Sequence, residues 1–212
     1  DIAGLAIMRE RAEQDDATGQ LLMGDAYWTG RGVPQDRDEG GRWYRLAIEQ
    51  FRTLAEQGDR DAQLTLGFVY TNGLGVPADW SEALGWFLMA AEQGDWNAES
   101  QLGDIYQSGA GVEKDFAQAA AWYAKAAKRG DMESLYRRAT LFLRGGPRLE
   151  ADPDKGIAMI LAAGRAGYAA AFTFAGRYYE GEFGDPVDSR LALEAYFLGA
   201  AAGDATAQYR LG

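Results

Sequence analysis

Apolar and small residues recur along the chain with the period of an α-helix, in short segments separated by glycine turns. In the clearest segment, residues 61–71, one helical face carries Leu66, Gly67 and Tyr70. A second periodic segment follows and stops at Gly94, where the next copy of the pattern begins. The pattern predicts pairs of amphipathic helices joined by short turns.

The turn inside each predicted helix pair has a fixed chemistry. Residues 73–77 read Gly-Leu-Gly-Val-Pro, in which glycine can close a helix in the left-handed conformation and proline prevents its continuation. Asp79 follows and is predicted to cap the next helix, with Glu82 completing a capping box. The same aspartate recurs as Asp36, Asp115, Asp152 and Asp188, with Glu39 and Gln118 as further box partners.

The helix pairs repeat at nearly constant spacing. With the glycine of a Leu-Gly-x-x-Tyr pattern as the reference position, successive copies are 43, 36, 36, 37 and 36 residues apart. A fixed period in this range indicates a stacked array, because one such unit cannot bury its apolar face alone. We therefore predict a single all-α domain over residues 1–212, with about five repeats and a partial repeat at each end, as part of a longer array. The reference positions are Gly24, Gly67, Gly103, Ala139, Gly176 and Gly212.

Two features of each repeat predict how its helices pack. Glycine within a helix costs about 0.5–1 kcal/mol relative to alanine, so its recurrence predicts close approach of a neighbouring helix backbone. A tryptophan recurs at one offset of the second helix and is predicted to fill the space between a hairpin and its neighbour. Trp86→Ala should then cost about 3–5 kcal/mol as a core truncation. The tryptophans at this offset are Trp43, Trp86 and Trp122.

Two repeats depart from the pattern. The spacing from Trp43 to Gly58 is 15 residues, whereas the corresponding spacing in the following repeat is 8, which is an insertion of seven residues or about two helical turns. The second helix of that repeat is expected to protrude. In the fourth repeat Ala139 replaces the glycine and Met159 replaces the tryptophan. That hairpin has either drifted or been reshaped for a ligand.

Charge and composition narrow the possible functions. The formal net charge of −11 argues against a nucleic-acid partner, because phosphate binding relies on clustered lysine and arginine. The sequence has no histidine and no cysteine, which removes thiol chemistry, disulfides and the common metal ligands. It has no apolar run of about 18 residues, so direct membrane insertion is not expected. We predict no metal and no cofactor, and a small-molecule ligand is not expected.

The offsets resemble the Sel-one-like repeat, a relative of the tetratricopeptide repeat with the pattern A-x-x-x-L-G-x-x-Y-x-x-G-x-G-V-x-x-D-x-x-x-A-x-x-W-x-x-x-A-A-x-x-G. Residues 62–94 match at almost every position, and residues 98–130 nearly as well. The resemblance implies a right-handed α-solenoid of antiparallel helix pairs that serves as a scaffold or adaptor for other proteins and is not an enzyme. It also implies bacterial roles in envelope signalling, secretion or toxin neutralisation, and favours the periplasm or cell envelope over the cytoplasm. The protein partner, the pathway and the oligomeric state stay open.

In related tandem hairpins the first helix of each repeat lines the concave wall, which gives candidate partner-binding residues by offset. These are Leu21, Asp25, Trp28, Leu64, Phe68, Thr71, Ser100, Asp104, Gln107, Tyr136, Thr140, Leu143, Thr173, Arg177 and Glu180. Trp28 and Phe68 are equally consistent with a core position. Trp96 is a further candidate, since repeat packing does not demand a tryptophan there, although a shielded contact at a helix junction is an equal alternative. Its counterparts in other copies are Arg60, Met132, Ala169 and Ala205.

Two alternative functions use other chemistry. Aromatic residues such as Trp28 and Trp96 could form platforms for a glycan or a cell-wall fragment. A hydrolase built on aspartate and glutamate is a second alternative, to which the pair Asp15 and Asp16 could point. It would require a carboxylate whose pKa is strongly raised in a pocket.

Overall fold

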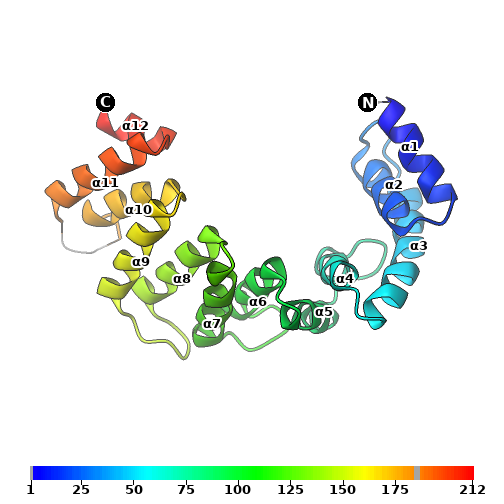
Figure 1. The fold of residues 1–212 in the computed structure, drawn as a ribbon, viewed down its shortest axis with the longest axis horizontal. Helices are drawn as coiled ribbons and strands as arrows, with labels where there is room; N and C mark the ends of the chain where they lie inside the picture. Colours follow the sequence, from blue (N-terminus) through cyan, green and yellow to red (C-terminus); the bar gives the residue numbers. More distant parts are fainter. Residues whose placement is uncertain (1, 184–186) are drawn as a thin grey trace. The chain divides into compact units, whose positions relative to one another are not determined.

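A computed structural model describes residues 2–183 and 187–212. Within these residues the chain folds into twelve α-helices and forms no β-strand, which confirms the all-helical prediction (Figure 1). The helices divide into two compact units, Asp1–Ala98 and Glu99–Gly212. The helices are α1 (Ile2–Glu13), α2 (Ala17–Thr29), α3 (Arg37–Glu56), α4 (Arg60–Asn72), α5 (Trp80–Glu92), α6 (Trp96–Ser108), α7 (Phe116–Lys128), α8 (Met132–Arg144), α9 (Pro153–Arg165), α10 (Ala170–Tyr179), α11 (Ser189–Ala201) and α12 (Ala205–Leu211).

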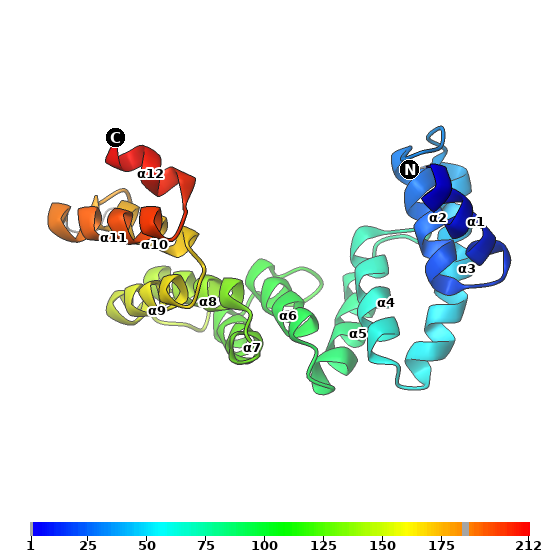
Figure 2. The ribbon, with the colours of Figure 1, turned by 45° about the horizontal axis from the view of Figure 1, so that its top comes forward.

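Consecutive helices within each unit pack as hairpins (Figures 1 and 2). The first unit contains the hairpins α2–α3 and α4–α5, with α1 packed on α2. In the second unit α8 packs on α9 and α10 on α11, while α12 packs on both α10 and α11. Each hairpin corresponds to one predicted repeat.

The predicted aspartate caps are confirmed. In α5, the side chain of Asp79 accepts hydrogen bonds from the amides of Ser81 and Glu82, and Gly73 closes the preceding helix with φ 65°. The capping box itself is not completed, because the Asp79 amide donates instead to the Tyr70 carbonyl of the first helix at 2.9 Å. This bond ties the two helices of the hairpin together. The aspartates that cap second helices in the same way are Asp36, Asp115, Asp152 and Asp188.

The recurrent glycine makes room for an aromatic ring, not for a helix backbone as the sequence suggested. A Cβ placed on Gly67 would lie 2.4 Å from the ring of Phe87, and one on Gly103 would lie 2.3 Å from the ring of Tyr123. Those distances are far below van der Waals contact, so the second helix presses its ring directly onto the glycine. The same arrangement joins Gly24 to Tyr44 and Gly176 to Tyr196.

This ring stands one residue after the predicted tryptophan, so the residue that packs on the glycine is not the tryptophan. The predicted place of the tryptophans between neighbouring hairpins stays a prediction. Phe87 is completely buried, whereas Trp86 is half-buried. Neighbouring residues on a helix point about 100° apart, and the glycine faces the second of the two aromatic residues. A large truncation cost is therefore expected at Phe87 as well, and the cost of Trp86→Ala stays a prediction.

The fourth repeat replaces both members of this contact together. Ala139 and Ile160 occupy the positions of the glycine and the ring, and both are completely buried in one apolar cluster. An isoleucine side chain reaches less far from its helix than an aromatic ring does. The first helix therefore has room at this point for the methyl group of Ala139. The fourth repeat thus compensates the larger residue on the first helix with a smaller one on the second, and the core stays packed.

The turn after α8 in this repeat has been reshaped to contact the preceding hairpin. Arg148, in the left-handed region at φ 63°, donates to Asp115 at 2.9 Å and to Glu113 at 2.7 Å. The pKa of Asp115 is held below its usual range, first by the amide hydrogen bond from Gln118 and then by the Arg148 guanidinium. The turn thus binds the capping aspartate of α7.

The seven-residue insertion lengthens α3, as predicted. This helix has 20 residues, whereas α5 and α7 each have 13. The extra turns do not protrude freely, because Phe51 and Ala55 are buried and the Arg52 guanidinium donates to the hydroxyl of Tyr70 in α4. The insertion therefore enlarges the contact between the first two hairpins.

Candidate partner-binding surface

In the first unit, the predicted aromatic residues are partly core and partly surface. Phe68 meets Phe87 edge to face with ring centroids 5.3 Å apart, and Trp28 meets Tyr44 in the same manner at 5.9 Å. Both side chains are half-buried, as are Leu21, Leu64 and Thr71 on the same helices. Each ring therefore contributes to packing and also leaves part of its surface open.

Asp25 has a role inside the hairpin. Its Oδ1 accepts a hydrogen bond of 2.5 Å from the hydroxyl of Tyr44, the ring that packs on Gly24. Burial of the ring, followed by this bond to a carboxylate, raises the pKa of Tyr44 well above its usual value. Asp25 thus satisfies a polar group that the hairpin itself brings into the core.

A concave site surrounds Trp28, and we call it the Trp28 groove. Its volume is about 490 Å³, and its walls are the start of α3 and the turn after α4. The guanidinium carbon of Arg37 lies 5.4 Å from the centre of the indole ring. Other residues lining the groove are Asp38, Gly41, Arg42, Arg45, Gly73, Gly75, Val76 and Pro77.

Trp96 stands at the first position of α6 and is 48% exposed. The alternative of a shielded contact at the helix junction does not fit this exposure. An exposed tryptophan is uncommon enough on a protein surface to keep the residue as a candidate contact.

In the second unit, the polar candidates are largely engaged within the chain. Asp104 receives the guanidinium of Arg137 at 2.5 Å and 2.6 Å, and its Oδ1 lies 2.6 Å from the hydroxyl of Tyr123. Gln107 lies 2.7 Å from the same hydroxyl. Ser100 lies 3.0 Å from Ser134 on α8, which joins two repeats.

The last predicted residues behave similarly. Arg177 forms a two-point ion pair with Glu182 at 2.6 Å and 2.5 Å. Glu180 accepts from Tyr196 at 2.7 Å and from Arg210 at 3.0 Å. These contacts stabilise the hairpins and lower the capacity of the polar residues to bind a partner. Thr173 donates to Asp204 at 2.6 Å, and Thr140 donates to the Arg137 carbonyl at 2.7 Å.

Tyr136 is the centre of an aromatic cluster between α8 and α10. Its ring lies 5.4 Å from Tyr168 and 5.4 Å from Phe174. Burial raises the pKa of Tyr136. Phe174 in turn stacks on Phe183 with centroids 4.9 Å apart and planes at 17°.

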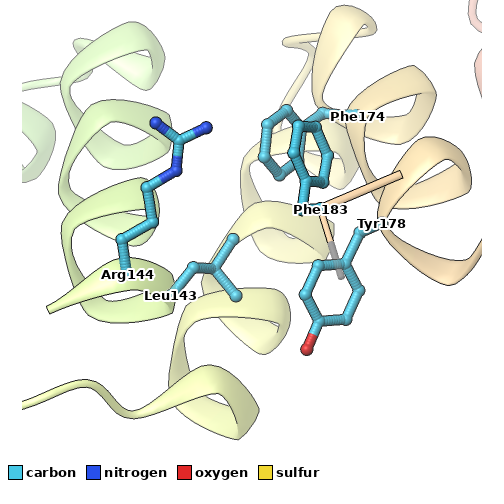
Figure 3. A pocket seen from close by; sticks show the side chains of 5 residues that line it. All are labelled: Leu143, Arg144, Phe174, Tyr178 and Phe183. Atoms are coloured by element: carbon cyan, nitrogen blue, oxygen red, sulfur yellow. The ribbon is translucent and has the colours of Figure 1, made fainter. Parts of the chain in front are cut away.

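This cluster opens into a pocket, which we call the aromatic cleft (Figure 3). Leu143 and Arg144 come from the end of α8, Phe174 and Tyr178 from α10, and Phe183 from the turn that follows. The cavity measures about 450 Å³. Of its lining, only Leu143 was predicted from the sequence as a binding residue, because the pocket is formed by two helices and a turn that no single offset connects.

The cleft could have been found by comparing repeats. Phe174 stands two residues before its reference glycine, and its counterparts are Leu22, Thr65, Gln101 and Arg137. Phe183 stands seven residues after it, with counterparts Arg31, Leu74, Ala110 and Gly146. In neither position does another repeat carry an aromatic residue.

The hydrolase alternative requires a carboxylate whose pKa is strongly raised. The carboxyl groups whose pKa is shifted, Asp115 and Glu182, are both shifted downward, Glu182 mainly by the hydrogen bond from Arg177. Asp16, one of the paired aspartates, caps α2. In the described part of the chain, acidic residues form no cluster suited to a metal ion, and no helix is long and apolar enough to cross a membrane.

Comparison with known proteins identifies the repeats. The model of the Sel1 repeat matches residues 17–50, 60–95, 96–131, 133–168 and 171–204, one match for each hairpin from α2 to α11. The chain belongs to the Sel1 repeat family. The first match ends at residue 50, just before the extra turns of α3. Sel1 repeats are typically protein-interaction scaffolds and are generally not catalytic.

Solved structures show the same α-solenoid fold. A Sel1 repeat protein from Oxalobacter formigenes is 30% identical with a TM-score of 0.64, and the match covers 92% of this chain and 74% of that protein. The protective antigen c5321 of uropathogenic Escherichia coli is 28% identical with a TM-score of 0.64. That match covers 96% of this chain but only 50% of the antigen, so this chain spans half of its length. The comparison with curated proteins gives no match.

Proposed function

We propose that this Sel1 repeat chain is a non-catalytic scaffold that binds a protein or peptide partner, with the Trp28 groove as one contact site. The observation that carries the proposal is the half-buried Trp28 at a position where the repeat frame does not require it. The counterparts of Trp28 in the other repeats are Thr71, Gln107, Leu143 and Glu180.

The composition of the groove supports a macromolecular partner. Tryptophan and arginine are the residues most often found at the energetic centres of protein interfaces. Arg37, Arg42 and Arg45 line the groove beside Trp28, in a chain whose net charge is −11. The local excess of guanidinium groups therefore differs from the character of the chain as a whole. A more specific role, in the envelope, in secretion or in toxin neutralisation, remains a prediction.

Site-specific cross-linking tests the proposal. A photoreactive benzoylphenylalanine replaces Arg42 at the rim of the groove, and in a second protein it replaces Arg190 on α11. The two arginines are matched, since their side chains are 72% and 80% exposed and each pairs with a glutamate on its own helix. In native cell extract we expect one defined protein adduct from position 42 and none of the same identity from position 190.

The variant Trp28→Ala should abolish that adduct while its circular dichroism stays helical. We expect it to cost about 1–3 kcal/mol of stability through loss of the edge contact with Tyr44. Equal cross-linking from both positions, or an unchanged adduct in Trp28→Ala, would remove the groove from the interface. Recovery of glycan without protein would favour the cell-wall alternative.

A further inference from the structure

The aromatic cleft has an apolar wall on one side and the guanidinium of Arg144 on the other. The stacked rings of Phe174 and Phe183 form the wall, and Tyr178 extends it (Figure 3). Arg144 extends from the end of α8 on the opposite side, with its guanidinium carbon 5.8 Å from the Phe183 ring. Leu143 lies between them.

The repeat frame does not account for Arg144. Its counterparts in the other repeats are the small or polar residues Thr29, Asn72, Ser108 and Gly181. A cation at a helix C-terminus is favourable, but that effect is small at an exposed position and calls for no aromatic wall. Arg144, Phe174 and Phe183 therefore all differ from their counterparts in the other repeats, and they lie together in the fold.

Arg144 differs from the neighbouring Arg177 in its ion pairing. The neighbouring Arg177, whose guanidinium carbon also lies 5.5 Å from the Phe183 ring, is neutralised by its two-point ion pair with Glu182. In the part of the chain that the structure describes, Arg144 contacts no carboxylate. A planar guanidinium beside a rigid aromatic surface is suited to a carboxylate that enters with an apolar group attached.

The chemistry of the lining also favours a peptide ligand over a sugar. Recognition of sugar hydroxyls needs acceptors as well as donors. Among the described residues of the lining no side chain carries an amide or a carboxylate, so the Tyr178 hydroxyl is the acceptor that they offer. Phe174 and Phe183 also cover one face of each other, which reduces the flat surface open to a sugar ring. An acidic residue beside an aromatic or aliphatic one meets both the cation and the wall.

We propose that the aromatic cleft binds a peptide segment in which an acidic side chain is adjacent to a large apolar side chain. The apolar group packs on Phe174 and Phe183, and the carboxylate accepts hydrogen bonds from Arg144. This assignment rests on the proposed function and specifies the chemistry that a second contact site, distinct from the Trp28 groove, recognises in a partner.

Blocked tetrapeptides test it with the whole chain. The probe is acetyl-Ser-Glu-Phe-Ser-amide, compared with peptides in which glutamine replaces its glutamate or alanine replaces its phenylalanine. A fourth peptide, acetyl-Ser-Phe with a free carboxyl end, distinguishes a terminal from a side-chain carboxylate. Titration of the ¹⁵N-labelled protein should shift the amides of residues 143, 144, 174, 178 and 183 with millimolar affinity. The glutamine peptide should bind about tenfold more weakly, since it loses the charge-assisted hydrogen bonds.

Two variants connect the effect to the site. Arg144→Gln should bind the glutamate and glutamine peptides equally, whereas Arg190→Gln on α11 should preserve the tenfold difference. Phe183→Ala, at a ring that is 38% exposed, should weaken every phenylalanine-containing peptide. Circular dichroism confirms that each variant is folded.

Three results would overturn the assignment. They are equal affinity of the glutamate and glutamine peptides for the wild-type chain, no shift at the cleft with 5 mM of any peptide, and tighter binding of the disaccharide N-acetylglucosaminyl-N-acetylmuramic acid. Tighter binding of the free-carboxyl peptide would reassign the carboxylate to a chain terminus. If cross-linking from position 42 persists while the peptides fail, only the cleft assignment falls and the scaffold proposal stands.

Discussion

At the scale of single residues, the first helix is matched to the ring that packs on it. In the third repeat the ring of Tyr123 packs on the reference glycine. Asp104, the residue after that glycine, lies 2.6 Å from the hydroxyl of Tyr123. In the second repeat the ring is Phe87, which has no hydroxyl, and the matching residue is the apolar Phe68. Between these two repeats the variation at this position therefore follows from satisfying a buried polar group and is not by itself a sign of a binding site.

Replacing Phe68 and Phe87 of the second repeat, singly and together, tests this matching. Phe87→Tyr should destabilise the chain by about 1–3 kcal/mol, because its hydroxyl finds no acceptor at Phe68. Phe68→Asp alone should be destabilising for the complementary reason. The double variant recreates the pair seen in the first and third repeats, so it should recover at least about 1 kcal/mol relative to the sum of the single effects. Urea unfolding measures the cycle, and strict additivity would contradict it.

The hydroxyl contacts also predict a dependence on alkaline pH. Burial, followed by the hydrogen bond to Glu180, raises the pKa of Tyr196 to about 12 from an ordinary value near 10. The folded state therefore holds this proton more tightly than the unfolded state. The resulting stabilisation is complete below about pH 10 and is lost as the pH rises toward 12.

Denaturant unfolding from pH 8 to pH 12 measures this loss. Wild-type stability should fall relative to Tyr196→Phe between pH 10 and pH 12, with little change in their difference below pH 10. Tyr209→Phe, at a ring that is 85% exposed, provides the control and should track the wild type. A constant difference between wild type and Tyr196→Phe up to pH 12 would show that the hydroxyl does not contribute in this way.

At the scale of helices, features that depend on local sequence were predictable. Features that depend on which way a side chain faces, or on which segments meet after folding, were not. The aspartate caps and the extra length of α3 followed from spacing along the chain, because a cap and its helix are neighbours in sequence. Whether Trp86 or Phe87 faces Gly67 depends on helix rotation, which adjacent aromatic residues leave ambiguous. The aromatic cleft was missed because Arg144 and Phe183 belong to segments that meet only after folding.

The extra turns of α3 can be tested by removing them. Gln50 lies 3.1 Å from Gln20, just as Gln93 lies 2.8 Å from Gln63 in the next repeat, so the helix pairing is regular up to Gln50. Deleting residues 51–57 leaves Gln50 followed by Gly58 and Asp59, which is the sequence Gln-Gly-Asp found at the end of α5.

We expect the shortened chain to fold, with a loss of helix signal equal to about seven residues. Its stability should fall, because buried Phe51 and Ala55 are removed along with the contact from Arg52. Circular dichroism and urea unfolding give both quantities. A chain that loses most of its helix would show that the long α3 is required to start the array.

At the scale of the whole molecule, stability comes from contacts between neighbouring hairpins, since each repeat is too small to fold alone. Within the first unit α3 contacts α4, and within the second α7 contacts α8 and α9 contacts α10. That all repeats behave as one continuous array, and that the array is longer than this chain, remain predictions. An array of this kind responds to a local lesion with an effect that declines from repeat to repeat.

The last helix offers such a lesion. Asp204 caps α12 by accepting from the Ala207 amide at 2.8 Å, and it also accepts from Thr173 of α10 at 2.6 Å. Asp204→Ala removes both bonds, and loss of the cap alone costs about 0.5–2 kcal/mol. In hydrogen exchange we expect α12 to lose its protection, α10 and α11 to lose part of theirs, and α2 to α5 to be unchanged. Equal loss of protection in α2 to α5 would mean that the chain unfolds as one cooperative body, and nearest-neighbour coupling would then not describe it.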